Sequence, residues 1–194
     1  MYTAKKEIYM PQSYAAEKRT LSVKFKTIAI IAAIAASVVI PQFFHWMGKV
    51  SGLGMAFGIA FSPMHFPVII AGFIGGPLVG AVTGLLGPAV SYLISGMPNM
   101  VQLPFMMIEL FGYGLCAGLL MNIKLPNVVK TLIVMIAGRV LRMLACVFAF
   151  YLLHNEKMAP LGIWRSIPSC LPGIFMQLVI IPLVVFRVEK RSKE

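Results

Sequence analysis

Ionisable side chains within apolar stretches are the residues of this sequence whose types and spacing could do chemistry. Glu109 lies halfway along one apolar stretch, and Arg139 and Arg142 lie three residues apart in the next. That spacing would place both arginines on one face of a helix. Because a charge in apolar surroundings is costly unless a partner compensates it, these residues are candidates for a binding site.

The charges of these three residues do not balance. If Glu109 pairs with one arginine, the other guanidinium keeps no counter-charge, and an anionic ligand could supply one, ideally a carboxylate held by two parallel hydrogen bonds. Glu109 could be either a structural ion-pair partner between two helices or an acceptor for a ligand N–H group. Arg142, or both arginines, could instead line a wet crevice or contact a lipid headgroup.

Other polar and aromatic residues extend the set of candidates for ligand binding. His65 fits a ligand pocket or a helix start better than a metal site, because no second His or Cys lies near it in the sequence. The tryptophans are either anchors at a membrane interface or an aromatic lid over a small organic ligand. This second group of candidates consists of His65, Asn99, Gln102, Tyr113, Gln177, Trp46 and Trp164.

Composition indicates the class of protein that must position these residues. Of the 194 residues, 59% are hydrophobic and 12% are charged, and the mean hydropathy is +0.88. Soluble domains carry about 25% charged residues, so we predict a polytopic membrane protein. The sequence has no Asp, no hydrolase or zinc-protease motif and no phosphate-binding glycine loop before a lysine. We therefore expect no enzyme, no catalytic residue, no metal and no cofactor.

Apolar runs of the length that crosses a bilayer divide the chain into an all-α domain of six membrane helices. The second run contains Pro63 and Pro67, which predict an irregular start. A glycine-rich loop over 45–57 is expected to be mobile without ligand and ordered with it. A polar lead (1–24) precedes the membrane domain (25–187), and a basic tail (188–194) follows it. The predicted spans are 25–44, 58–75, 77–94, 101–121, 128–153 and 167–186.

Basic residues predict how the chain lies in the membrane. Twelve of the 17 Lys and Arg residues fall on the side of the two termini, and three fall in the opposite loops. Such a bias marks the cytoplasmic side, so both termini are expected there, in the cell membrane. The net charge of +11 is then a topology signal and a contact for anionic lipids, not a nucleic-acid surface.

Small residues recur at four-residue spacing in two places. One stripe includes Ala29, Ala33 and Ser37, with Ala32 and Ala36 beside it, and a second consists of glycines from Gly72 to Gly84. Small side chains let helices approach closely in lipid. We expect the glycines to pack inside the protein, whereas the alanines could pack internally or dock on a partner.

Several short motifs, taken in order, resemble the substrate-binding S components of energy-coupling factor (ECF) vitamin transporters. They are Met64-His65-Phe66-Pro67-Val68, Gly72-Phe73-Ile74-Gly75-Gly76-Pro77, the run from Gly80 to Pro88, Gly96-Met97-Pro98, Glu109-Leu110-Phe111-Gly112-Tyr113-Gly114 and Gly138-Arg139. The resemblance implies an S-component bundle that captures a vitamin-like substrate from outside, near the outer face. It also implies a transmembrane coupling subunit and two cytoplasmic ATPase subunits as partners, with Ala29, Ala32, Ala33 and Ala36 docking on the coupling subunit.

The resemblance does not specify the substrate. The surplus of buried arginine favours a carboxylate vitamin, with pantothenate as the preferred example. A nucleobase-like ligand such as a queuosine precursor is the alternative, in which Glu109 would accept from N–H groups and Trp or Tyr would stack. Outside this transporter class, a membrane scaffold subunit would need no converging Glu and Arg, and a membrane enzyme would need a reactive constellation that is not found.

Overall fold

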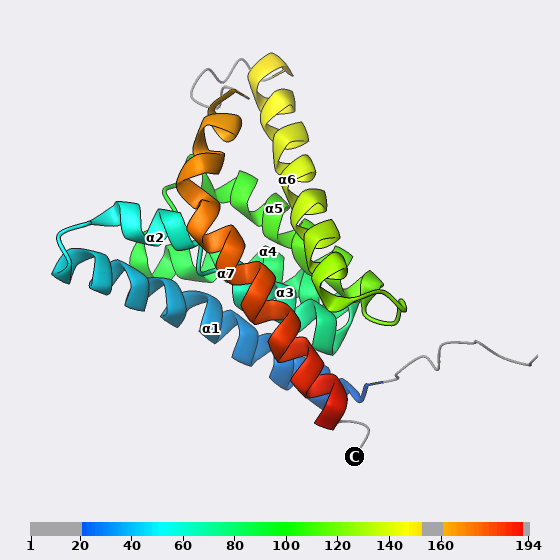
Figure 1. The fold of residues 1–194 in the computed structure, drawn as a ribbon. Helices are drawn as coiled ribbons and strands as arrows, with labels where there is room; N and C mark the ends of the chain where they lie inside the picture. The colour runs from blue at the N-terminus through cyan, green and yellow to red at the C-terminus, as the bar shows by residue number, and fades with distance from the viewer. Residues whose placement is uncertain (1–20, 153–160, 192–194) are drawn as a thin grey trace, which may run out of the picture.

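The computed structural model describes residues 21–152 and 161–191, which form seven α-helices and no strand (Figure 1). Within these described ranges, six spans are long and apolar enough to cross a membrane, and the short α2 joins α3 in one of them, over Ala56–Gly75. This confirms the predicted all-α architecture with six spans. The helices are α1 (Val23–Val50), α2 (Met55–Phe61), α3 (His65–Gly75), α4 (Pro77–Ser95), α5 (Leu103–Leu120), α6 (Asn127–Leu152) and α7 (Leu161–Arg191).

The first helix is longer than predicted, and the predicted loop over 45–57 is wrong. Helix α1 continues to Val50, so only residues 51–54 connect it to α2. Two contacts explain why the chain stays helical. Phe44 stacks on Phe57 with ring centroids 5.9 Å apart, and a Cβ on Gly48 would collide with the backbone of Gly54. Aromatic packing and one close approach therefore hold α1 and α2 together where the glycine content favoured a loop.

The second span is broken, as its prolines predict. Helix α2 ends before Ser62, which has left-handed backbone angles (φ 43°, ψ 52°), and Pro63 follows. Helix α3 then starts at His65. The break thus places His65 at the first turn of a helix that begins inside a span.

Helix α7 also extends beyond its predicted bounds. It starts at Leu161, inside the outer loop that connects the predicted spans 128–153 and 167–186, and it ends at Arg191, inside the predicted tail. The part of that loop up to residue 160, including Lys157, lies outside the described residues.

Glycines bring α3, α4 and α5 into close contact. A Cβ on Gly80 would collide with the backbone of Gly114, and one on Gly84 would collide with that of Leu110. Gly72 likewise faces the carbonyl oxygen of Gly114. The prediction that this stripe packs inside the protein is confirmed for these three glycines.

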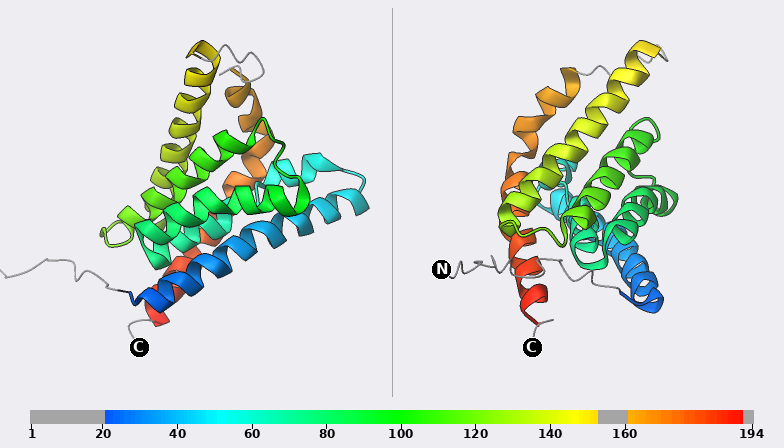
Figure 2. Two further views of the ribbon diagram at one scale, coloured as in Figure 1. Left: turned by 180° about the vertical axis from the view of Figure 1, so that it is seen from behind. Right: turned by 90° about the vertical axis from the view of Figure 1, so that its right-hand side faces the viewer.

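The helices form two groups that diverge toward one end of the molecule. Helices α6 and α7 lean together and away from α1 and α4, with α5 between them (Figure 2). The beginning of α1 and the end of α7 both lie at the opposite end of the molecule (Figures 1 and 2). Helix α5 packs on α3, α4 and α6, and α7 packs on α2 and α3, so these two helices join the two groups.

Candidate functional site

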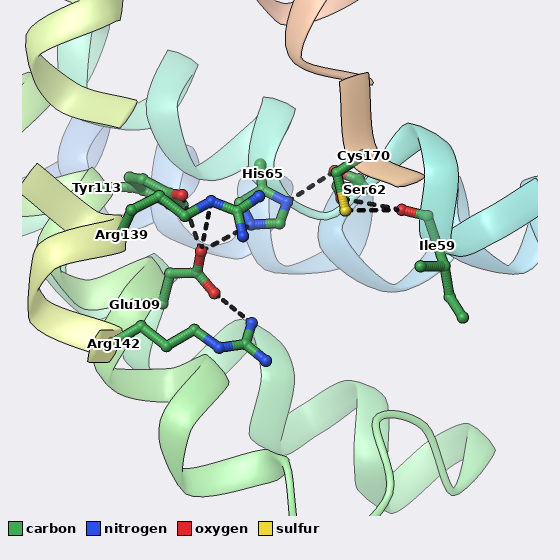
Figure 3. A network of polar contacts seen from close by, with 8 residues as sticks. All are labelled: Ile59, Ser62, His65, Glu109, Tyr113, Arg139, Arg142 and Cys170. Carbon is green, nitrogen blue, oxygen red and sulfur yellow. Dashed lines mark hydrogen bonds and ion pairs between the residues drawn. The ribbon is translucent and has the colours of Figure 1, made fainter. Parts of the chain in front are cut away.

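A buried polar cluster centres on the carboxylate of Glu109 in α5 (Figure 3). The side chain of Glu109 is 0% exposed. Its Oε2 accepts a hydrogen bond from Nη1 of Arg142 at 2.6 Å, and its Oε1 accepts one from the Tyr113 hydroxyl at 2.8 Å. Nε of Arg139 lies 3.4 Å from Oε1. Both sequence-predicted arginines therefore meet the one predicted carboxylate.

Close backbone approach between α5 and α6 makes this meeting possible. A Cβ on Gly138 would collide with the Tyr113 ring, and one on Gly112 would collide with Leu141. Arg139 and Arg142 follow Gly138 on α6, one and four residues later. The two glycines thus let the helices come near enough for side chains of α6 to reach a fully buried group on α5.

Each arginine contacts Glu109 and keeps part of its surface accessible. The side chains of Arg139 and Arg142 are 23% and 22% exposed. Nε of Arg142 is buried and has no hydrogen-bond partner among the described residues. One carboxylate faces two guanidinium groups, so the three side chains together keep one surplus positive charge. That surplus was the main expectation from the sequence.

His65 completes the cluster from α3. Its Nδ1 lies 2.8 Å from the carbonyl oxygen of Ser62, and its ring meets Tyr113 edge to face at 5.1 Å. Its Nε2 is buried and lies 3.8 Å from Oε1 of Glu109, too far for a hydrogen bond. Within 21–152 and 161–191, this nitrogen has no hydrogen-bond partner. No group of three or more potential metal ligands occurs in the described part of the chain.

The remaining predicted site residues lie elsewhere or are not described. Gln177 is buried on α7, whereas Trp46 is exposed near the end of α1. Asn99 and Gln102 are exposed in the α4–α5 connection, where Oδ1 of Asn99 accepts from the backbone N–H of Gln102. Within 21–152 and 161–191, no hydrogen bond or ion pair joins these four side chains to the Glu109 cluster. The side chain of Trp164 is outside the described part.

Two residues near the cluster were not predicted. Ser62 supplies the carbonyl oxygen that binds His65, and the Cys170 thiol donates to the carbonyl oxygen of Ile59 at 3.7 Å. The Ser62-Pro63 pair was a signal for a backbone break. Nothing in the sequence pairs Cys170 with Ile59, which lies 111 positions earlier.

The alanine stripe on α1 is not uniformly exposed. Ala32 is exposed, whereas Ala29, Ala33 and Ala36 are half-buried. Ser37, on the same helix, is buried and faces Gly87 of α4. Part of the stripe therefore faces the neighbouring helices, and Ala32 is its most accessible member.

Six apolar spans around a buried cluster of ionisable groups define a polytopic membrane protein with a polar site inside its helix bundle. A family model described as "ECF transporter, substrate-specific component" matches residues 23–185, and the chain belongs to this family. No curated protein and no solved structure matches the chain. Membership makes it a multi-pass cell-membrane protein, the substrate-binding subunit of an ECF transporter, in a family of transporter components and not of enzymes. Its partners are the coupling and ATPase subunits of that transporter.

Proposed function

We propose that this subunit binds a carboxylate-bearing vitamin, with pantothenate as the preferred example. One observation carries the proposal: among the described residues, two arginines converge on a single buried carboxylate, which leaves one positive charge without a counter-charge. A ligand carboxylate would neutralise that charge at a depth where water screens little. Hydrogen bonds between ionised partners are about twice as strong as neutral ones, which suits capture of a scarce solute.

Glu109 acts in this proposal as the residue that holds the arginines. Its two oxygens already face Arg142, Tyr113 and Arg139. The same carboxylate is fully buried, whereas both arginine side chains remain partly accessible. The guanidinium groups are thus better placed than Glu109 to contact an incoming ligand. This arrangement favours a carboxylate over a nucleobase-like ligand, which would need Glu109 as its acceptor.

The proposed orientation has both termini in the cytoplasm. Lys24 and Lys26 lie at the beginning of α1, and Arg187 and Lys190 lie near the end of α7. Both helix ends lie at the same end of the molecule (Figures 1 and 2). The positive-inside bias of the sequence supports the assignment of this side to the cytoplasm. The ligand would then enter from the opposite side, where α6 and α7 diverge from α1 and α4 (Figure 2).

Arg139→Gln tests the proposed substrate class. Loss of one charge-assisted contact should cost about 1.5–3 kcal/mol of binding free energy, or roughly 10- to 150-fold in the Kd for pantothenate. Calorimetry on the purified protein in detergent would measure it, after native mass spectrometry has identified any co-purified small molecule.

Two controls of the same charge change separate the site from general electrostatics. Arg187→Gln removes an exposed guanidinium from α7, and Lys157→Gln removes a charge from the predicted outer loop. Both should leave the Kd within about twofold, which is the effect expected of a screened surface charge. An unchanged Kd in Arg139→Gln would remove this residue from the site and the case for a carboxylate substrate with it.

A further inference from the structure

The ring of His65 holds a buried nitrogen that receives no hydrogen bond from the described residues. Nδ1 lies 2.8 Å from the carbonyl oxygen of Ser62. Because a carbonyl oxygen only accepts, Nδ1 must carry the proton of this hydrogen bond. Nε2 is buried, has no hydrogen-bond partner and lies 3.8 Å from Oε1 of Glu109.

The charge around His65 indicates what Nε2 can do. Glu109, Arg139 and Arg142 already sum to one positive charge, and a protonated His65 would add a second one at membrane depth, which is costly. Tyr113, the other titratable group against the ring, donates its hydroxyl to Glu109 and supplies no further negative charge. On α7, Cys170 donates its thiol to Ile59. A neutral ring with its proton on Nδ1 presents Nε2 as a bare acceptor.

We propose that Nε2 of His65 accepts a hydrogen bond from an N–H or O–H group of the substrate, close to the substrate's carboxylate. This inference rests on the carboxylate ligand proposed above and adds a second recognition point to it. Nε of Arg139 and Nε2 of His65 lie against the same oxygen, Oε1 of Glu109. A carboxylate on the arginines and a donor on His65 would therefore belong to neighbouring parts of one small molecule. The substrate class becomes an anion with a donor beside its acid group.

Pantothenate has this pattern, because its amide N–H is separated from its carboxylate by a short methylene spacer. Its ester analogue, in which oxygen replaces the amide N–H, keeps the carboxylate and the two distant hydroxyl groups and loses only the donor beside the acid group. The pair of compounds therefore probes the acceptor without any change to the protein. We expect the ester to bind the unmodified protein about 10- to 100-fold more weakly, since it leaves Nε2 buried against another acceptor.

Two His65 variants assign this preference to the ring nitrogen. His65→Phe keeps a ring against Tyr113 and removes the acceptor, so the two compounds should bind with equal affinity. His65→Gln retains an acceptor oxygen and should keep part of the preference for the amide. Thermal unfolding of each variant in detergent checks that it is folded. The comparison of amide and ester on the unmodified protein tests the inference even if a variant fails to fold.

The possible outcomes separate this inference from the proposed function. If pantothenate binds and His65→Phe still prefers the amide as strongly as the unmodified protein does, His65 is not the acceptor, while the carboxylate proposal stands. If the unmodified protein binds amide and ester equally, it does not recognise a donor beside the acid group, and the inference is overturned. Pantothenate could fail to bind while the co-purified molecule is an anion without any N–H or O–H group. That result would overturn both the proposed hydrogen bond to His65 and pantothenate as the preferred substrate. Failure to bind with a co-purified ligand that lacks an acid group would overturn both proposals.

Discussion

Helix α5 makes two helix contacts of opposite character. Toward α3 and α4 it presents Gly114 and the backbone of Leu110, which meet glycines so closely that a single added Cβ would collide. Toward α6 it presents Glu109 and Tyr113, which meet Arg139 and Arg142 through hydrogen bonds and charge. Glycines allow close approach on both faces. On the first face backbone meets backbone, whereas on the second the glycines Gly112 and Gly138 meet side chains, and hydrogen bonds and charge are added.

The comparison shows how one helix can be both fixed and functional. In lipid, apolar burial does not drive helices together, so close backbone contact is what fixes α5 against α3 and α4. That fixed position determines where the Glu109 carboxylate lies. The exposed parts of the two arginine side chains can then contact a ligand while the backbone of α5 keeps its position. Three substitutions test this division, ordered by their expected effect on stability.

Glu109→Gln should have the largest effect on stability. It leaves two guanidinium groups in the bundle without a counter-charge, and breaking a buried pair in this way costs about 3–5 kcal/mol of unfolding free energy. Binding of pantothenate should be retained or tightened, because the freed positive charge attracts the ligand. Thermal unfolding and calorimetry would measure the two effects. Tyr113→Phe is the control, since it removes one hydrogen bond to the same carboxylate and no charge. A sharp loss of pantothenate binding in Glu109→Gln would mean that the carboxylate touches the ligand.

Gly80→Ala should destabilise the protein through the other face of α5. The added Cβ meets the backbone of Gly114, which no rotamer change can relieve, and overpacking of this kind costs about 1–3 kcal/mol. Gly87→Ala is the matched control on the same helix, because its Cβ would meet only the Ser37 side chain, at 3.2 Å or more. The Tm of the two variants in detergent should differ by several degrees. Equal Tm values would show that the α4–α5 contact adapts as readily as a side-chain contact.

Ala32→Trp should have the smallest effect on stability and a large effect on transport. Ala32 is exposed on α1, so the change should stay within about 0.5 kcal/mol and leave pantothenate binding intact. If the stripe docks on the coupling subunit, the large ring holds the two proteins apart, and uptake of labelled pantothenate by cells with the complete transporter should fall to background. Leu93→Trp, at a position on α4 that is 81% exposed, is the control and should transport normally. Normal uptake in Ala32→Trp would remove this stripe from the docking surface.

The sequence predicted the architecture well because hydropathy and small-residue spacing are local signals. The six spans, the break near Pro63 and the internal glycine stripe follow from residues that act within a few positions of one another. The end of α1 was missed because it depends on Phe44 meeting Phe57 and Phe61 across a turn.

The candidate site could be predicted in part. The position of ionisable residues inside apolar stretches indicated Glu109, Arg139 and Arg142 as site residues. The count of their charges predicted one surplus positive charge. Sequence could not tell that both arginines contact the same carboxylate, which depends on the close approach at Gly112 and Gly138. Nor could it distinguish His65, whose ring joins the cluster, from Asn99 and Gln102, which lie in an exposed connection.

The break between α2 and α3 has a consequence for how the backbone is satisfied in hydrocarbon. A span interrupted within the bilayer leaves carbonyl groups without helical partners, and each one costs several kcal/mol if it stays unpaired in lipid. Here the carbonyl oxygen of Ile59 accepts from Cys170 of α7, and that of Ser62 accepts from the backbone N–H and Nδ1 of His65. The hydrogen bond that satisfies the Ser62 carbonyl is therefore also the one that selects the tautomer of His65. A mutation that repaired the break into a continuous helix would satisfy the backbone and, by the same step, leave the orientation of the His65 ring unspecified.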